Sequence, residues 1–125
     1  MRARFRYTGI RVRDLERSRA FYTEVFGMKE IAEGTMPHGG RYVHLRTPGS
    51  QQRLELNWYP ETSRFYTEYR SGEEMDHLAF VVDDVRKVYR ELVRKGVAVA
   101  VDPTHSKDTE VYLKDPDGIW IELLA

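Results

Sequence analysis

The chain of 125 residues contains no cysteine. This absence excludes disulfide-stapled folds and metal sites built on thiolates. The chain also lacks net charge, because its 20 basic and 20 acidic residues cancel. A neutral balance provides no general electrostatic attraction for nucleic acid or for an anionic membrane surface. We therefore expect neither of these as a partner.

Long apolar runs are missing as well. No run approaches the ~20 residues of a membrane-spanning helix, and the basic start MRARFRYTGI lacks the apolar stretch of a secretory signal peptide. We therefore expect a soluble cytoplasmic protein. Apolar residues nevertheless make up 41% of the chain, which is enough for the core of one ordinary domain.

One pattern occurs twice along the chain. The stretch YTGIRVRDL, which begins at Tyr7, is matched by HLAFVVDDV, which begins at His77. Each predicts a strand that runs into an acidic helix cap, Asp14 in the first copy and Asp84 in the second. An apolar stripe at helical spacing follows each cap, and a glycine then ends the helix. The repeat indicates two equivalent structural modules.

A further strand and a hairpin follow the helix in each copy. The hairpin turns contain TPGS and DPDG, in which proline presets the turn and glycine permits a positive φ. The sequence therefore predicts an α+β fold of two tandem βαβββ modules. We place the modules at about residues 1–59 and 76–125, joined by a linker at 60–75, within a single domain of residues 1–125.

Two glutamates interrupt apolar strands near the end of each module. Leu and Ile residues on either side of Glu55 and Glu122 are expected to face the helix, so each carboxylate should point to the open face of its sheet. A carboxylate in such a place is costly unless it titrates, pairs or meets a cation. Arg53 or another arginine could pair with one of them. A metal ion would satisfy both glutamates and His77 at once.

Four stretches of the chain carry a resemblance to a known family. They are RVRDLERSRAFYTEVFGMK, LEL around Glu55, DHLAFVVDDV and DPDGIWIEL, of which the last is the most specific. The chain resembles, over essentially its whole length, the vicinal oxygen chelate superfamily of glyoxalase I, extradiol dioxygenases, fosfomycin resistance proteins and bleomycin-binding proteins. The resemblance implies paired βαβββ modules around a cleft, with metal ligands on the first and last strands of each. The matching positions here are Tyr7, Glu55, His77 and Glu122.

These four positions separate the members of the superfamily. Ring-cleaving dioxygenases and fosfomycin enzymes have two His and a Glu, and bleomycin-binding members lack the set. Methylmalonyl-CoA epimerase has His, Gln, His and Glu. With Tyr, Glu, His and Glu, the chain is most similar to bacterial glyoxalase I, which has His at the first position. A phenol ordinarily ionises only at about pH 10. Tyr7 therefore either binds the metal as a phenolate, hydrogen-bonds a metal-bound water, or fills the cleft.

Similarity to glyoxalase I, a lactoylglutathione lyase, implies a metal-dependent enzyme. Such an enzyme isomerises a 2-oxoaldehyde–thiol hemithioacetal through a metal-bound enediolate. Glu122 is the expected base, with Glu55 as its pseudo-symmetric partner. One His and two carboxylates suit Ni, Co, Zn, Mn or Fe(II), and glutathione or another thiol would be the co-substrate.

Two alternatives remain: a metal-dependent epimerase on the same scaffold, and a small-ligand-binding protein without enzymatic activity. The cleft forms within one chain or between two, and we expect a homodimer.

Three more side chains on the open faces are candidates for substrate binding. Arg11 shares a strand face with Tyr7, and the resemblance implies that it holds a carboxylate of glutathione; an internal salt bridge is the alternative. Trp120 shares the face of Glu122, where it would form an apolar wall or pack in the core. His44 would contact the substrate or a second acid, or would be an ordinary polar residue of the sheet.

Overall fold

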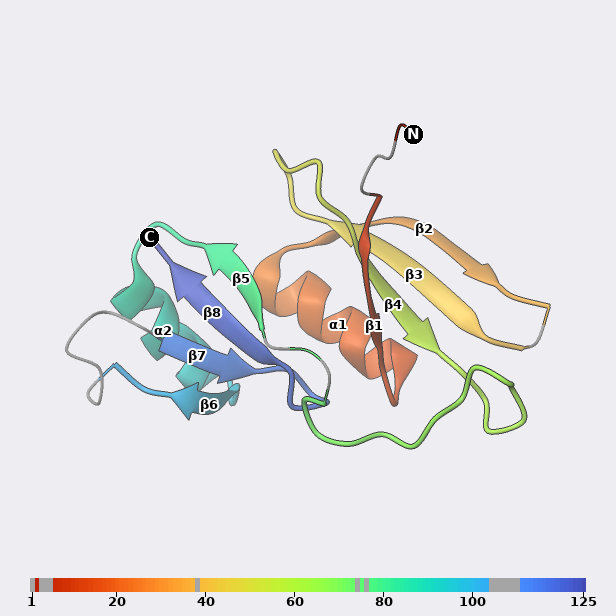
Figure 1. The fold of residues 1–125 in the computed structure, drawn as a ribbon. Helices are drawn as coiled ribbons and strands as arrows, with labels where there is room; N and C mark the ends of the chain where they lie inside the picture. The colour runs from red at the N-terminus through yellow and green to blue at the C-terminus, as the bar shows by residue number, and fades with distance from the viewer. Residues whose placement is uncertain (1, 3–5, 38, 74, 76, 104–110) are drawn as a thin grey trace. The chain divides into compact units, whose positions relative to one another are not determined.

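The computed structural model describes residues 2, 6–37, 39–73, 75, 77–103 and 111–125. The chain divides into two compact units, Met1–Glu68 and Tyr69–Ala125, and the division falls inside the predicted linker. Among these described residues, each unit contains one helix and one four-stranded sheet, which confirms the α+β fold of two βαβββ modules (Figure 1). In the described part of the chain, no helix has the length and apolar character needed to cross a membrane.

The described part of the first unit runs in the order strand, helix, strand, strand, strand. The bounds of these elements are β1 Thr8–Arg11, α1 Leu15–Phe26, β2 Lys29–Thr35, β3 Arg41–Arg46 and β4 Leu54–Trp58. The sheet order is β1-β4-β3-β2, with β1 parallel to β4 and the other neighbours antiparallel. Helix α1 packs on β3 and β4, so it covers one face of the sheet (Figure 1).

The second unit repeats this arrangement. Its elements are β5 Leu78–Val81, α2 Val85–Arg94, β6 Ala98–Val101, β7 Val111–Lys114 and β8 Trp120–Leu124. The sheet order is β5-β8-β7-β6, again with the first strand parallel to the last. Helix α2 packs on β8. The first strand of each unit begins one residue later than predicted, so Tyr7 and His77 directly precede β1 and β5.

Burial along the last strands follows the predicted alternation. In β4, Leu56 is fully buried under the helix while Glu55 is only partly buried. In β8, Ile121 is likewise fully buried while Glu122 is only partly buried. Because successive side chains of a strand point to opposite faces, both glutamates lie on the open face of their sheet. The apolar stripe predicted after Asp84 consists of Val85, Val88, Tyr89, Leu92 and Val93, and its last member does not follow the prediction, since Val93 is 41% exposed.

The predicted helix caps are present in both units. The Asp14 carboxylate accepts a hydrogen bond from the Arg17 backbone N–H at 3.0 Å, and Asp84 accepts one from the Lys87 N–H at 2.9 Å. Each carboxylate thereby satisfies an amide that the first helical turn leaves without a partner. At the other end of α1, Gly27 adopts a left-handed conformation with a φ of 65°. A residue with a Cβ is strained in that conformation, which explains glycine as the stop.

We expect alanine at either cap position to destabilise the fold by a similar amount. Asp14→Ala and Asp84→Ala should each lower the free energy of unfolding by about 1 kcal/mol, because one amide of the helix loses its acceptor. Chemical denaturation followed by circular dichroism measures this change. Asp14→Ser and Asp84→Ser are the controls, since serine keeps a capping oxygen. An alanine variant as stable as its serine counterpart would contradict the assignment of the cap.

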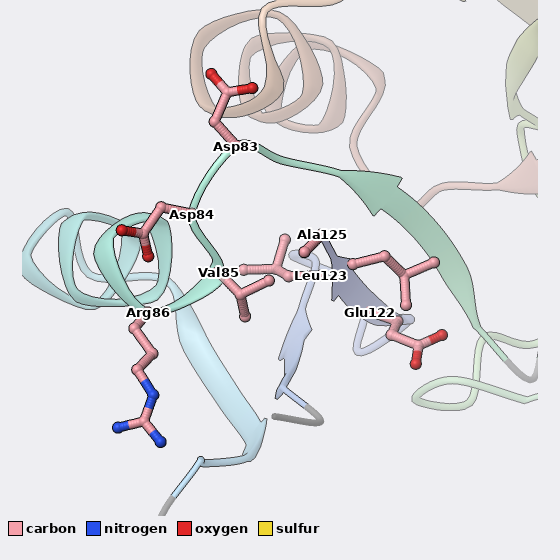
Figure 2. Close-up of a pocket in the computed structure, with 8 residues that line it drawn as sticks. Asp83, Asp84, Val85, Arg86, Glu122, Leu123 and Ala125 are labelled. Carbon is pink, nitrogen blue, oxygen red and sulfur yellow. The ribbon is translucent and has the colours of Figure 1, made fainter. Parts of the chain in front are cut away.

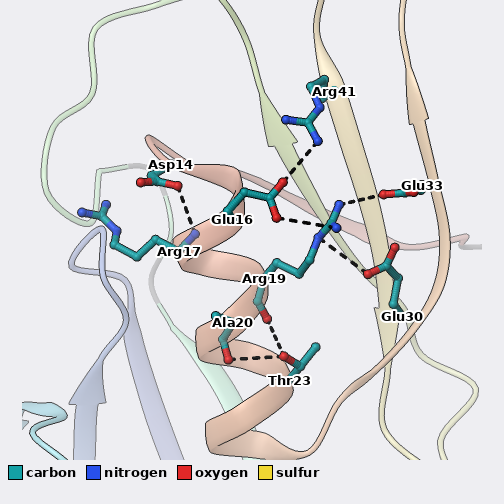
Figure 3. Close-up of polar contacts among 9 residues, drawn as sticks. All are labelled: Asp14, Glu16, Arg17, Arg19, Ala20, Thr23, Glu30, Glu33 and Arg41. Atoms are coloured by element: carbon teal, nitrogen blue, oxygen red, sulfur yellow. Dashed lines mark hydrogen bonds and ion pairs between the residues drawn. The ribbon is translucent and has the colours of Figure 1, made fainter.

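Helix α1 is also held to its sheet by charged side chains. Arg19 places Nη2 2.8 Å from Oε2 of Glu33 and Nε 3.6 Å from Oε2 of Glu30, both on β2 (Figure 3). Its Nη1 lies 3.6 Å from Oε2 of Glu16, and Arg41 of β3 approaches Oε1 of Glu16 at 3.2 Å. Exposed ion pairs each contribute little to stability. Together, however, these contacts connect the helix to the strands at the outer side of the sheet.

The outer strand of each sheet carries a bulge at an equivalent place. In β2, Ile31 is an extra residue between the partners of Leu45 and His44 on β3. In β6, Ala100 is the extra residue opposite β7. The two units therefore match in this irregularity as well as in their regular elements.

Candidate functional site

In the first unit, three of the predicted site residues gather on the open face of the sheet. Tyr7 precedes β1, His44 lies on β3 and Glu55 lies on β4. His44 and Glu55 are direct partners in the antiparallel register, and Nε2 of the imidazole lies 2.5 Å from Oε2 of the carboxylate. Their side chains are only 12% and 14% exposed. Glu55 is thus paired with an imidazole, whereas the sequence left open a pairing of one glutamate with Arg53 or another arginine.

Aromatic rings hold His44 on two sides. The centroid of its ring lies 5.0 Å from that of Tyr7 and 5.4 Å from that of Tyr42, both in tilted arrangements. Such contacts restrict the orientation of the imidazole. Gly9 lies beside the carboxylate, because an added Cβ would lie 3.7 Å from Oε1 of Glu55 and 3.2 Å from Nδ2 of Asn57. The first unit therefore presents an oriented imidazole–carboxylate pair packed closely against its neighbours.

Tyr59, just beyond β4, adds a further polar group near this pair. Burial raises the pKa of its phenol, the neighbouring Glu55 and Tyr7 raise it further, and Arg11 lowers it. With a raised pKa, the phenol stays protonated at neutral pH and is able to donate a hydrogen bond. Arg11 itself donates from Nη1 to the backbone carbonyl of Thr67 at 2.9 Å. That contact fixes the guanidinium near the site, and its binding to a substrate remains a prediction.

The second unit holds a comparable pair on its open face. Nε2 of His77 lies 3.2 Å from Oε2 of Glu122, with side chains 33% and 16% exposed. The ring of Tyr112 on β7 meets the His77 ring edge-on, with centroids 5.6 Å apart. Trp120 continues this row, 5.7 Å from Tyr112. Trp120 is 41% exposed, so it is not packed in the core, and its use as an apolar wall remains a prediction.

The two pairs have the right chemistry for a divalent metal ion. Each offers one imidazole nitrogen and one carboxylate oxygen, donors that suit zinc and the other divalent transition metals. Two ligands of one ion lie roughly 3 Å apart when each metal–ligand bond is about 2.0–2.2 Å, and the pairs are separated by 2.5 and 3.2 Å. Within either unit, the described residues include no group of three His, Asp or Glu placed to hold a metal. Neither pair alone therefore completes a coordination shell without further ligands.

A pocket of about 360 Å³ borders the second pair, where β8 ends and α2 begins (Figure 2). Its lining comprises Asp83, Asp84, Val85, Arg86, Glu122, Leu123, Leu124 and Ala125. The lining includes Glu122 but not His77, so the pocket lies beside the pair and does not enclose it.

The predicted metal ligands are thus divided between the units. Tyr7 and Glu55 belong to the first and His77 and Glu122 to the second. In the structure, Glu55 contacts His44 and Glu122 contacts His77, and ligation of a metal by these side chains remains a prediction.

The contact of Tyr112 with His77 was not predicted from the sequence. The alternation of Val111 and Leu113 with Tyr112 and Lys114 in the sequence was the available signal, because it places Tyr112 on the face opposite the core.

Comparison with known proteins adds independent information. Residues 4–123 match the model of the Glyoxalase/Bleomycin resistance protein/Dioxygenase superfamily. A lactoylglutathione lyase of Arabidopsis thaliana is 32% identical over 133 residues, which cover 97% of this chain and 44% of that protein. The chain thus spans less than half the length of that relative. Among solved structures, the trypanothione-dependent glyoxalase I of Leishmania major is 31% identical, with a TM-score of 0.76 over 98% of this chain and 86% of that one. An antibiotic-binding protein from Streptomyces sp. CB03234 is 26% identical, with a TM-score of 0.73 over 98% of this chain and 94% of that one.

Proposed function

The chain belongs to the glyoxalase/bleomycin resistance protein/dioxygenase superfamily, and we propose that it is a metal-dependent lyase of the glyoxalase I type. The observation that carries the proposal is the His77–Glu122 pair, 3.2 Å apart on the open face of its sheet, with Glu55 at the equivalent position of the other module. Similarity to the lactoylglutathione lyase of Arabidopsis and the glyoxalase I of Leishmania supports the substrate class. That substrate is the hemithioacetal of a 2-oxoaldehyde and a thiol.

The proposed reaction is an internal transfer of hydrogen. A divalent cation bound by His77, Glu122 and Glu55 would supply Lewis acidity toward two vicinal oxygens of the substrate. Glu122 takes the proton from the carbon that bears the hydroxyl and the sulfur, and returns it to the adjacent carbonyl carbon. The hydroxyl proton passes to the former ketone oxygen. The product is a 2-hydroxy thioester with the same atoms as the substrate.

Other side chains would bind the rest of the substrate. Trp120, exposed on the same face as Glu122, offers apolar surface to the group carried by the oxoaldehyde. Arg11 would hold a carboxylate of the thiol, with Tyr59 as a neutral hydrogen-bond donor nearby. We propose that the enzyme works in the cytoplasm as a homodimer, which light scattering of the purified protein would test.

Turnover of the hemithioacetal tests the proposal. Protein loaded in turn with Ni, Co, Zn, Mn and Fe(II) is mixed with methylglyoxal and either glutathione or trypanothione. With at least one metal, the thioester should form with a kcat of about 1–10³ s⁻¹, the ordinary range for enzymes. Chelator-treated protein is the control and should be inactive until metal is restored. Protein that binds metal but forms no thioester with either thiol would remove the lyase assignment.

A second candidate function is the binding of a small apolar ligand without catalysis. The similarity to the antibiotic-binding Streptomyces protein favours it, and the exposed Trp120 would suit an aromatic ligand. Metal content separates the candidates, because simple binding needs no ion. Protein that retains no metal after loading supports the second candidate and excludes the first.

A further inference from the structure

The two modules contain the same three side chains at the site, but in exchanged positions. Tyr7 precedes the first strand of its module as His77 precedes that of the second. On the third strand, His44 is the register partner of Glu55, and Tyr112 is the register partner of the second glutamate, Glu122. At these three positions each module therefore has one His, one Tyr and one Glu. The His and the Tyr have changed places between them.

The contacts are similar in spite of the exchange. The imidazole of each module approaches the carboxylate of the same module, at 2.5 Å for His44 and 3.2 Å for His77. The tyrosine of each module packs its ring against the imidazole, with centroids 5.0 and 5.6 Å apart. The imidazole of the first module thus reaches the carboxylate from the third strand, and that of the second module reaches it from the first.

We propose that His44, and not Tyr7, supplies the first-module nitrogen ligand to the divalent cation. This inference rests on the metal binding proposed above. A neutral imidazole is a better ligand for Ni, Co or Zn than a protonated phenol, because it offers a lone pair without losing a proton. Nε2 of His44 is directed at Oε2 of Glu55, so both atoms reach one ion after a small change in their separation.

Burial and orientation support the same assignment. The His44 side chain is 12% exposed, whereas Tyr7 is 38% exposed. The rings of Tyr7 and Tyr42 flank the imidazole and restrict its rotation, as outer-shell contacts do at metal sites. Tyr7 is therefore a positioning residue. It occupies the position of the missing first-strand histidine without taking over ligation.

Cobalt titration tests the inference with a readout that does not depend on activity. Wild type, His44→Ala, Tyr7→Phe and His77→Ala are titrated with Co²⁺ and followed by visible absorption, with bound metal measured by mass spectrometry. His44→Ala should weaken binding by more than about tenfold and alter the visible spectrum, because a nitrogen ligand is lost. Tyr7→Phe keeps the ring and removes only the oxygen, and should bind within about threefold of wild type. His77→Ala tests the proposed metal site itself.

A double exchange guards against loss of folding. Tyr7→His combined with His44→Tyr gives the first module the arrangement that His77 and Tyr112 have in the second. This variant should bind Co²⁺ more tightly than His44→Ala and recover a spectrum like that of wild type. Circular dichroism and thermal unfolding establish that each variant is folded. Recovery of cobalt binding in the double variant shows that an imidazole nitrogen is required. No recovery would contradict the proposal that His44 supplies this ligand in place of a first-strand histidine.

The outcomes distinguish this inference from the proposed function. If wild type binds no cobalt, the metal site and the role of His44 both fall. If His77→Ala loses the metal, His44→Ala keeps it and Tyr7→Phe loses it, the metal site stands. The inference about His44 is then overturned in favour of Tyr7.

Discussion

Glu122→Gln is expected to lower kcat for the hemithioacetal by about 10²–10⁴-fold while the chain stays folded. Glutamine has nearly the size of glutamate but cannot accept the proton from carbon. Glu122 is only 16% exposed and contacts Nε2 of His77 at 3.2 Å. It is the only carboxylate of this pair, so the pair itself contains no second carboxylate that could replace it as the base. Steady-state kinetics of metal-loaded protein measure the loss, and circular dichroism establishes that the variant is folded.

Two further variants make the result of Glu122→Gln specific. Glu24→Gln changes an exposed carboxylate on α1 and should leave kcat as in wild type. Glu55→Gln tests which of the two carboxylates is the base, because Glu55 holds the equivalent position in the first module. Since Glu122 is also a proposed ligand, bound metal is measured in each sample, and kcat is compared per metal-loaded chain. Unchanged turnover in Glu122→Gln would remove this residue from the mechanism.

His77→Ala is expected to lower metal affinity by more than about 100-fold. Loss of an outer-shell partner alone typically costs 10–100-fold, and removal of a ligand should cost at least as much. The side chain contacts Glu122 and packs against the ring of Tyr112, so its loss also frees the carboxylate to move. Elemental analysis after loading with each metal and gel filtration measures the change.

Val81→Ala is the matched control for this substitution. Val81 lies on β5, the strand that His77 directly precedes, and is 78% exposed, so its truncation removes side-chain atoms near His77 in the chain without removing a donor. It should retain the metal content of wild type. One tightly bound ion in His77→Ala would contradict ligation by His77.

The fold could be predicted from the sequence because each part of the module has a local signal. Asp14 and Asp84 cap the helices they were expected to cap, and the alternation around Glu55 and Glu122 identified the open faces. These features depend on residues close together in the chain. Burial by partners elsewhere in the chain is harder to predict, which is why Val93 fits the apolar stripe of α2 and is nevertheless exposed.

The contacts of the candidate site were less predictable. The approach of His44 to Glu55 depends on the register of β3 against β4, and the seven-residue segment between these strands (47–53) allows more than one register. If the register of β3 against β4 shifted by one residue, His44 would lie opposite Leu54 or Leu56 instead of Glu55, and its side chain would point to the other face of the sheet. The sequence therefore identified Glu55 as a costly carboxylate but not the imidazole that accompanies it.

The bulges of β2 and β6 also affect how the protein behaves at high concentration. Each of these strands ends its sheet, and an outer strand offers unpaired amides and carbonyls to the strand of another molecule. The extra residues Ile31 and Ala100 interrupt the regular spacing of those groups. In β2, Lys29 and Glu30 add charge that an incoming strand would have to bury. The irregularity that the modules share thus protects both outer strands from edge-to-edge aggregation.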